Sequence, residues 1–258
     1  MRCTHSLAFA ATVLLTTVAS ASDAPAKFTD SPRSLQNRVL FPNGGGDVSA
    51  VIRCTAIIDK KGWVEGNHCY SDHAQFVRFS DAIHIAAKGA RFAPLIWNGQ
   101  PEAARVHYSV HFRRDAEQEH IDTWLHHDFN VTAHDGTFIA AQMALGKASP
   151  ERPACSSQMD HFVVTDIAAD GAVTDVSLIN TETPKNCAQQ TAAWHAQASY
   201  VAAQLDGKQV DSTYVYYHRA LQSFPLDPNT NLGRRQRHSI QSATYQVAEI
   251  PTLASKTP

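Results

Sequence analysis

Hydrophobic and polar positions follow the same three-part pattern twice along this chain. An apolar stretch broken by a turn with a glycine is followed by an Ala-rich stretch and then by a turn into an alternating strand. The two turn glycines are 37 positions apart in the first copy (Gly62 to Gly99) and 36 in the second (Gly171 to Gly207). A repeat of this length indicates two related structural units and has to be recognised before a fold is assigned.

The first copy predicts a hairpin, a helix and a strand. Residues 51–58 and 63–70 are rich in β-forming side chains, and residues 59–62 separate them as a four-residue loop. Residues 76–90 place apolar side chains on one helical face, and Gly89 marks the end of the predicted helix. The strand that follows has one buried face, because apolar residues alternate with polar ones. These apolar residues are Val106, Tyr108, Val110 and Phe112.

The second copy predicts the same elements in the same order. Strands are expected at 162–167, 173–179 and 212–217, and a helix is expected around 189–200. Each helix has to lie across its sheet, because the apolar helix stripe and the apolar strand face must bury each other. We therefore predict an α+β fold of two tandem β-β-α-β modules, each a small antiparallel sheet with one helix packed on it.

The rest of the chain is less regular. Ordered structure is expected to begin near Asp47, and between the copies residues 117–127 are a candidate helix and 138–145 a short apolar segment. Residues 244–250 alternate enough to form an edge strand. The expected divisions are 1–21 (signal peptide), 22–46 (leader and loop), 47–114 (first module), 115–152 (connecting segment), 153–219 (second module) and 220–258 (polar C-terminal tail).

The N-terminus has the features of a secretory signal. Arg2 and His5 precede an apolar run at 7–19, and Ala19-Ser-Ala21 suits the small-residue rule for cleavage. A retained membrane anchor is the alternative, but this run is shorter than the ~20 residues that a bilayer span needs. We expect cleavage after Ala21, no transmembrane segment in the mature chain, and a periplasmic location.

The cysteines point to disulfide bonds. An even number remains after signal cleavage, and exported chains favour disulfides, although four cysteines allow three connectivities. The midpoint of Cys54 and Cys69 falls beside Gly62, and the midpoint of Cys155 and Cys187 falls on Gly171. Each pair therefore straddles the hairpin turn of its own copy, which predicts Cys54–Cys69 and Cys155–Cys187. A catalytic or metal-binding thiol is the alternative, and the oxidising compartment disfavours it.

Charge and motifs argue against several functional classes. With 22 basic and 24 acidic residues, the chain has no basic field for nucleic acid. It also has no Gly-x-Ser-x-Gly, His-Glu-x-x-His or phosphate-loop motif, so we predict no enzyme, no catalytic residue and no cofactor. A metal site is the third alternative, but the connecting histidines have neither a nearby carboxylate pattern nor a His-x-His, which favours solvated side chains. These histidines are His120, His126, His127 and His134.

The motifs around the first copy resemble the C-terminal domain of TonB-type energy transducers. The resemblance covers about residues 41–112, and the second copy, about 153–218, matches less well because residues 200–203 have no proline. The motifs in the first copy are Phe41-Pro42, Ile58-Asp59-Lys60-Lys61-Gly62-Trp63-Val64, Arg91-Phe92-Ala93-Pro94 and Asn98-Gly99-Gln100-Pro101. The chain departs from the family in having a cleavable signal and no long Pro-rich segment.

This resemblance implies a protein-binding function. The family's domain is understood to engage the plug end of outer-membrane receptors, and an open sheet edge accepts an extended peptide by backbone hydrogen bonding. We expect a periplasmic interaction module that binds an envelope protein or peptide segment, such as an outer-membrane receptor. The alternatives are TonB-dependent transport energised in trans and metal binding by histidines. The candidate partner contacts are Phe41, Pro42, Val106, Tyr108, Val110 and Phe112. Packing of aromatic residues into the core is the competing interpretation.

Overall fold

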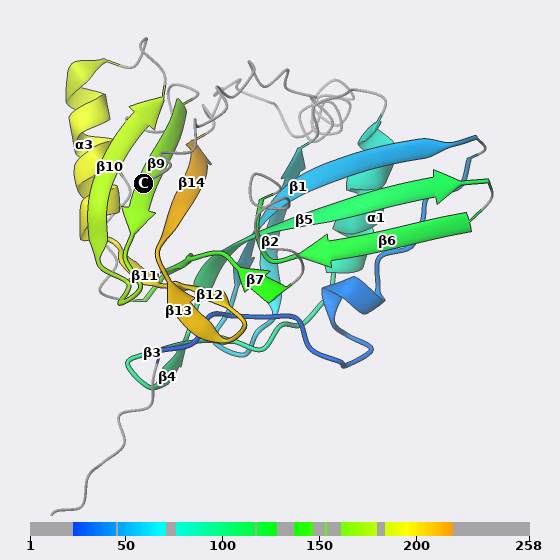
Figure 1. Ribbon diagram of the computed structural model, residues 1–258, viewed down its shortest axis with the longest axis horizontal. Helices are drawn as coiled ribbons and strands as arrows, with labels where there is room; N and C mark the ends of the chain where they lie inside the picture. The colour runs from blue at the N-terminus through cyan, green and yellow to red at the C-terminus, as the bar shows by residue number, and fades with distance from the viewer. Residues whose placement is uncertain are drawn as a thin grey trace, which may run out of the picture.

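The described part of the chain is a mixed α and β fold in which most strands are antiparallel (Figure 1). A computed structural model describes residues 23–44, 46–70, 76–116, 118–127, 137–146, 153, 161–179 and 184–218. The α+β class is thereby confirmed. The predicted signal peptide, the polar tail and the strand at 244–250 lie outside the described residues.

The largest sheet has six strands and is built around a long antiparallel pair, β1 and β5, which are in register from Val48↔Arg114 to Ile58↔Ala104. The predicted hairpin is confirmed, because β1 pairs with β2 on its other side. Across the sheet the order is β11 (Ser199–Val201), β8 (Gln142–Ala144), β5 (Ala104–Asp115), β1 (Val48–Ile58) and β2 (Val64–Tyr70), and β6 (Gln118–Trp124) also pairs with β5.

Helix α1 (Val77–Ala87) packs on β2 and β1. Its buried face includes Phe79, Ile83 and Ala87, which recur at helical spacing as the sequence predicts. After the helix, β3 (Leu95–Trp97) and β4 (Gln100–Glu102) form a hairpin. Its turn residues, Asn98 and Gly99, have φ values of 51° and 72°, as a tight two-residue turn requires.

A second sheet has three strands in the order β10 (Val173–Ile179), β9 (His161–Ile167) and β14 (Ser212–His218). Helix α3 (Lys185–Gln197) packs on β10 and β9, and it begins four residues earlier than predicted. A third sheet joins three short strands beneath them. These are β13 (Lys208–Val210), β12 (Ala203–Leu205) and β7 (Phe138–Ile139), and the turn between β12 and β13 has positive φ at Asp206 and Gly207.

The two halves of the molecule share a sheet. Figure 1 shows α3 and the β10–β9–β14 sheet on the left and the long β1, β5 and β6 strands on the right. Strand β11 follows α3 in the chain, yet it pairs with β8, which in turn pairs with β5. Apolar side chains form two buried clusters, one around β1, β5 and α1 and the other around α3, β12 and β14.

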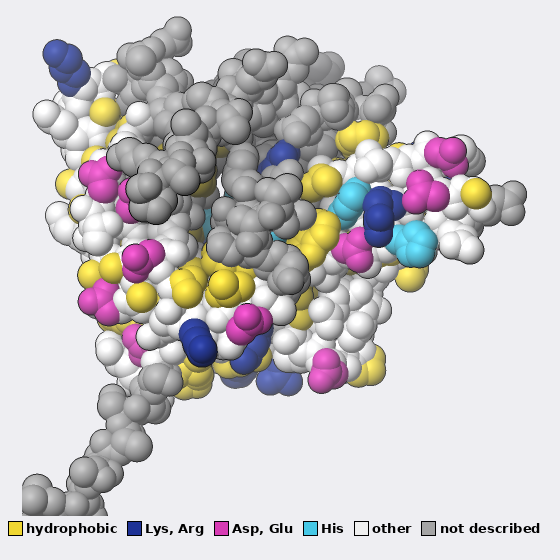
Figure 2. Space-filling view, viewed as in Figure 1, with side chains coloured by type: hydrophobic (Ala, Val, Ile, Leu, Met, Phe, Trp, Pro, Cys, Tyr) yellow, Lys and Arg dark blue, Asp and Glu magenta, His cyan; other side chains and the backbone are white. Residues whose placement is uncertain are grey.

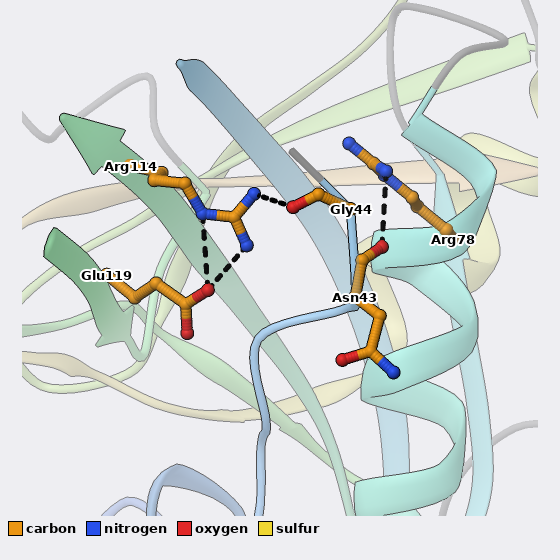
Figure 3. Close-up of polar contacts among 5 residues, drawn as sticks. All are labelled: Asn43, Gly44, Arg78, Arg114 and Glu119. Atoms are coloured by element: carbon orange, nitrogen blue, oxygen red, sulfur yellow. Dashed lines mark hydrogen bonds and ion pairs between the residues drawn. The ribbon is translucent and has the colours of Figure 1, made fainter. Parts of the chain in front are cut away.

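The segment at 117–127, expected to be helical, contains a strand instead. Ile121, Trp124 and Leu125 have helical spacing, but β6 pairs with β5 from Asp115↔Gln118 to Ser109↔Trp124, and sheet pairing overrides the local pattern. An ion pair supports this register, because the Arg114 guanidinium contacts the carboxylate of its register partner, Glu119 (Figure 3). Arg114 also donates a hydrogen bond to the Gly44 carbonyl. Figure 3 also shows Arg78 of α1 donating to the Asn43 carbonyl.

Ordered structure begins before Asp47, so that expected starting point is wrong. Ala26, Leu35 and Val39 are buried in the core, and Leu35 begins a short 3-10 turn, η1 (Leu35–Asn37). The Ala26 backbone forms hydrogen bonds in both directions with the side-chain amide of Gln142 on β8, at 2.7 and 2.8 Å. Residues 23–44 therefore belong to the packed structure.

The turn glycine of the first hairpin is predicted to be irreplaceable. Gly62 has a φ of 85°, and a Cβ there would lie 2.0 Å from the Phe92 carbonyl oxygen. Gly207 has a similar φ of 76° but open space around it, which makes Gly207→Ala a matched control. We expect Gly207→Ala to lower the free energy of unfolding by about 1 kcal/mol and Gly62→Ala by about 2 kcal/mol, measured by urea denaturation. Equal losses would show that the carbonyl moves away at no cost.

Candidate functional site

Phe41 and Pro42, predicted to contact a partner, are both half-buried in the structure. The Phe41 ring packs edge-on against Phe79 and Phe112, with centroid distances of 5.8 and 5.6 Å, and the Arg114 guanidinium lies 4.5 Å above its centre. These contacts place the Phe41 ring against the core between α1 and β5. These contacts show that Phe41 helps to pack the core. Binding of a partner by the exposed part of its ring stays a prediction.

The other four predicted contacts lie in the core. Their strand, β5, is central in the sheet, with β1 on one side and β6 and β8 on the other. On this second side β8 pairs with residues 104–105 and β6 pairs with residues 109–115, and each of the four predicted contact residues is 0% exposed. These residues, Val106, Tyr108, Val110 and Phe112, therefore do not offer an accessible contact face in this structure, because sheet pairing and packing already use them.

The disulfide predicted for the first copy is present. Cys54 on β1 and Cys69 on β2 are register partners, and their sulfur atoms are 2.05 Å apart. Cys187 at the start of α3 is also in disulfide form. Its predicted partner, Cys155, lies outside the described residues, so the Cys155–Cys187 pairing stays a prediction.

The connecting histidines are spread over different environments. His120 is exposed on β6, whereas His126 and His127 are buried just after it, and His134 lies outside the described residues. Within the described ranges, no group of three or more His, Cys, Asp or Glu side chains is arranged to hold a metal ion. The described histidines therefore give no support to a metal centre.

A buried group of basic and aromatic side chains lies where the two main sheets meet. Arg105 and His107, two positions apart on β5, share one strand face and lie against the rings of Tyr214 and Tyr216, which share one face of β14. We call this group the junction cluster. Its members are Arg105, His107, His127, His195, Tyr200, Tyr214 and Tyr216.

Two histidines of the junction cluster form a buried pair. The Nδ1 atom of His107 lies 3.1 Å from the Nε2 atom of His127 and 3.1 Å from the Thr55 hydroxyl. Burial, with the neighbouring Arg53, lowers the pKa of His127 to about 3. Burial also lowers the pKa of His107 well below its usual value, and His127 and Arg105 add to this effect. Both imidazoles are therefore neutral at neutral pH.

Two tyrosines of the junction cluster, Tyr200 and Tyr214, are neutral hydrogen-bonding groups. Burial raises the pKa values of Tyr200 and Tyr214. The Tyr200 hydroxyl forms a 2.8 Å hydrogen bond with Nδ1 of His195 on α3. Arg105 lies with its guanidinium carbon 4.5 Å from the centre of the Tyr216 ring and donates to the Met143 sulfur at 3.3 Å. The cluster thus combines one fixed positive charge with several neutral donors.

The sequence alone does not predict that the residues of this cluster lie together. Its residues come from β5, β11, β14, α3 and the segment that follows β6, so their contacts depend on how the two halves meet. The alternation of Arg105 and His107 with apolar residues was visible in the sequence. Polar residues at such positions normally face solvent, and only the packing of β14 against this face of β5 shows that these two are buried.

The sheet edges differ in how well they can accept another strand. Among the described residues, β2, β6, β10 and β14 each pair on one side only. Strand β6 carries Glu119, His120 and Asp122. Acidic, basic and histidine side chains gather on the surface at that end of the molecule (Figure 2). Charges of this kind blunt an edge against strand addition.

Two of the other edges are irregular. The pairing of β2 shifts register opposite Ile57, and β10 shifts register between Val173 and Asp175. Strand β14 pairs with β9 without a shift over seven residues, from Ser212↔Ile167 to His218↔His161, and contains no Lys, Arg, Asp or Glu. It is as regular as β6 and the least charged of these four edges.

No helix in the described part of the chain is long and apolar enough to cross a membrane. Comparisons of the whole chain with protein-family models, with curated proteins and with solved structures found no match to any of them.

Proposed function

We propose that this chain is an exported periplasmic protein that binds an extended segment of an envelope protein by adding it to the free edge of β14. The carrying observation is the regular, uncharged strand Ser212–His218, which pairs only with β9 among the described residues. An edge of this kind presents a row of backbone N–H and C=O groups, and an added strand satisfies them by hydrogen bonding.

The resemblance to TonB-type domains is consistent with this position for the partner. We propose that the chain consists of two tandem β-β-α-β modules and that β5 and β14 are equivalent last strands. In support, β5 pairs with the first strand of its hairpin, β1, just as β14 pairs with β9. The outer side of β5 pairs with β8 at 104–105 and with β6 at 109–115, whereas the outer side of β14 pairs with no strand among the described residues.

Turn geometry also supports the relation between the two copies. Gly62 and Gly171 have nearly equal φ values of 85° and 86°, and each lies against a backbone carbonyl that follows its helix. In the first copy this carbonyl belongs to Phe92, and in the second it belongs to Tyr200. Two unrelated hairpins have no reason to share this close approach, because the turn glycine is needed only where the backbone segments touch.

Export of the chain is supported by the cross-strand disulfide. The Cys54–Cys69 bond joins two buried side chains of one hairpin, and such structural disulfides persist in oxidising compartments such as the periplasm. The energised-transport alternative requires a motor supplied by another protein, and no described residue favours it over simple binding.

Site-specific photo-crosslinking tests the partner edge. A photoreactive amino acid replaces Thr213 on β14 in cells that express the full chain, and we expect one discrete cross-linked product that maps to an extended segment of an envelope protein. Adding Val215→Lys should abolish this product, because a lysine on an edge strand disfavours strand addition. The matched control is Val176→Lys on β10, since both valines are half-buried on edge strands of the same sheet.

Loss of the product with Val215→Lys and its retention with Val176→Lys would support β14 as the binding edge. Equal effects of the two lysines, or persistence of the product in both, would contradict it. Urea denaturation of both variants establishes that the sheet still folds, so that a loss of cross-linking reports on the edge rather than on unfolding.

A further inference from the structure

Arg105 is a buried cation without an anionic partner in the described structure. Its exposed fraction is 9%, and no described carboxylate lies within ion-pair distance of its guanidinium. Its neighbours are the Tyr214 hydroxyl, the Tyr216 ring and the sulfur of Met143, which is a weak acceptor. A buried charge is normally paired, because removing it from water is costly.

Several buried polar atoms lie near this cation without a close hydrogen-bond partner. The Tyr214 hydroxyl, the Thr165 hydroxyl and the Nε2 atom of His107 are buried and make no hydrogen bond in the described structure. Tyr214 and Thr165 are register partners on β14 and β9, and the His107 and Tyr214 ring centroids are 4.7 Å apart. The neighbourhood therefore offers two hydroxyl groups, one ring nitrogen and one positive charge to a ligand.

We propose that the junction cluster binds a small carboxylate ligand, with Arg105 as its charge partner and Tyr214, Thr165 and His107 as additional hydrogen-bond donors. A carboxylate matches the guanidinium fork with two parallel N–H···O bonds. Its single negative charge balances the single positive charge of Arg105, whereas a doubly charged phosphate leaves an excess negative charge in a buried site.

This site is independent of the β14 edge. The proposed strand partner pairs with the backbone of β14, whereas the ligand contacts side chains on the buried face of that strand. Either proposal can fail without the other, because one is tested by cross-linking to a protein and the other by binding of a small molecule to the purified chain.

The test is the stability of the full chain as a function of acetate concentration, with chloride at matched ionic strength as the control. A ligand that binds only the folded state shifts the unfolding equilibrium about 100-fold at ~100 times its dissociation constant, and the shift follows a binding curve. We expect acetate to give such a saturable shift and chloride to give only a small, unsaturable one. Equal effects of the two anions would overturn the proposal.

Two substitutions identify the site. Arg105→Met removes the charge but keeps a long side chain, and it should abolish the acetate-specific shift. Tyr214→Phe removes one hydroxyl that has no hydrogen-bond partner, so the fold should persist while the affinity for acetate falls about tenfold. Tyr214→Phe also keeps the test valid if Arg105→Met fails to fold. Unchanged affinity in Tyr214→Phe would overturn the assigned position.

Discussion

Acidification from about pH 7.5 to about pH 4.5 is expected to lower the free energy of unfolding by about 2–3 kcal/mol through His127 alone. The pKa of this buried imidazole is lowered to about 3 in the folded state, whereas in the unfolded chain it returns to about 6.5. The unfolded chain therefore binds more protons between these two values. Stability is fully present above the unfolded pKa and is lost as the pH falls toward the folded one.

His107 should add to this loss in the same direction. Its pKa is also lowered, mainly by burial, and its ring nitrogen contacts that of His127, so protonation of either one places a charge beside the other. Because the two sites interact, the loss is measured for the pair, and the contribution of one residue is not simply additive.

The measurement is a series of urea denaturation curves across this pH range. His127→Leu should be less stable at neutral pH, because it removes the hydrogen bond to His107, but its stability should depend less on pH by about 2 kcal/mol over the range. The control is His120→Leu, because His120 is exposed on β6. If the variant at position 127 has the same pH dependence as the wild type, the buried imidazole is not the group that titrates.

Removal of the Cys54–Cys69 disulfide is expected to lower the free energy of unfolding by about 3 kcal/mol. The bond closes a loop with a sequence separation of 15, and the chain-entropy model gives about this value for such a loop. Both side chains are buried, with exposed fractions of 0% and 5%. The replacement of choice is therefore the double variant Cys54→Ala and Cys69→Ala, which leaves no buried unpaired thiol.

Two comparisons distinguish the stability that the covalent bond contributes from the stability that the packing of the two side chains contributes. The single variant Cys69→Ala loses the bond and leaves the Cys54 thiol in place, so it should lose nearly as much stability as the double variant. Peptide mapping under non-reducing conditions should recover residues 54 and 69 in one linked pair. A double variant as stable as the wild type would mean that the β1–β2 hairpin needs no cross-link.

Elements with strong local signals could be predicted from the sequence. The β1–β2 hairpin follows from β-forming residues on both sides of Gly62, and α1 follows from the spacing of Phe79 and Ile83. The Cys54–Cys69 bond follows from the same hairpin symmetry, because residues at equal distances from a turn become register partners. In these cases short-range pattern and final structure agree.

Features that depend on distant contacts could not be predicted. Strand β6 has a partly helical pattern, and its conformation is decided by pairing with β5 rather than by its own residues. The burial of the four predicted contact residues on β5 depends on a core cluster that distant residues such as Leu35, Leu125 and Val201 also join. The junction cluster needs β14 and α3 to lie against β5, which no periodicity within one segment records.

The position of β11 bears on how this chain folds during synthesis. Strand β11 begins at Ser199 and joins, through β8, a sheet whose central strands start at Val48 and Ala104. The ribosome therefore has to release about three quarters of the chain before this sheet can gain its last strand. Until then the outer side of β8 has no partner in the nascent chain. Long-range pairing of this kind slows folding, because the entropy cost of closing the loop comes before the stabilising contacts form.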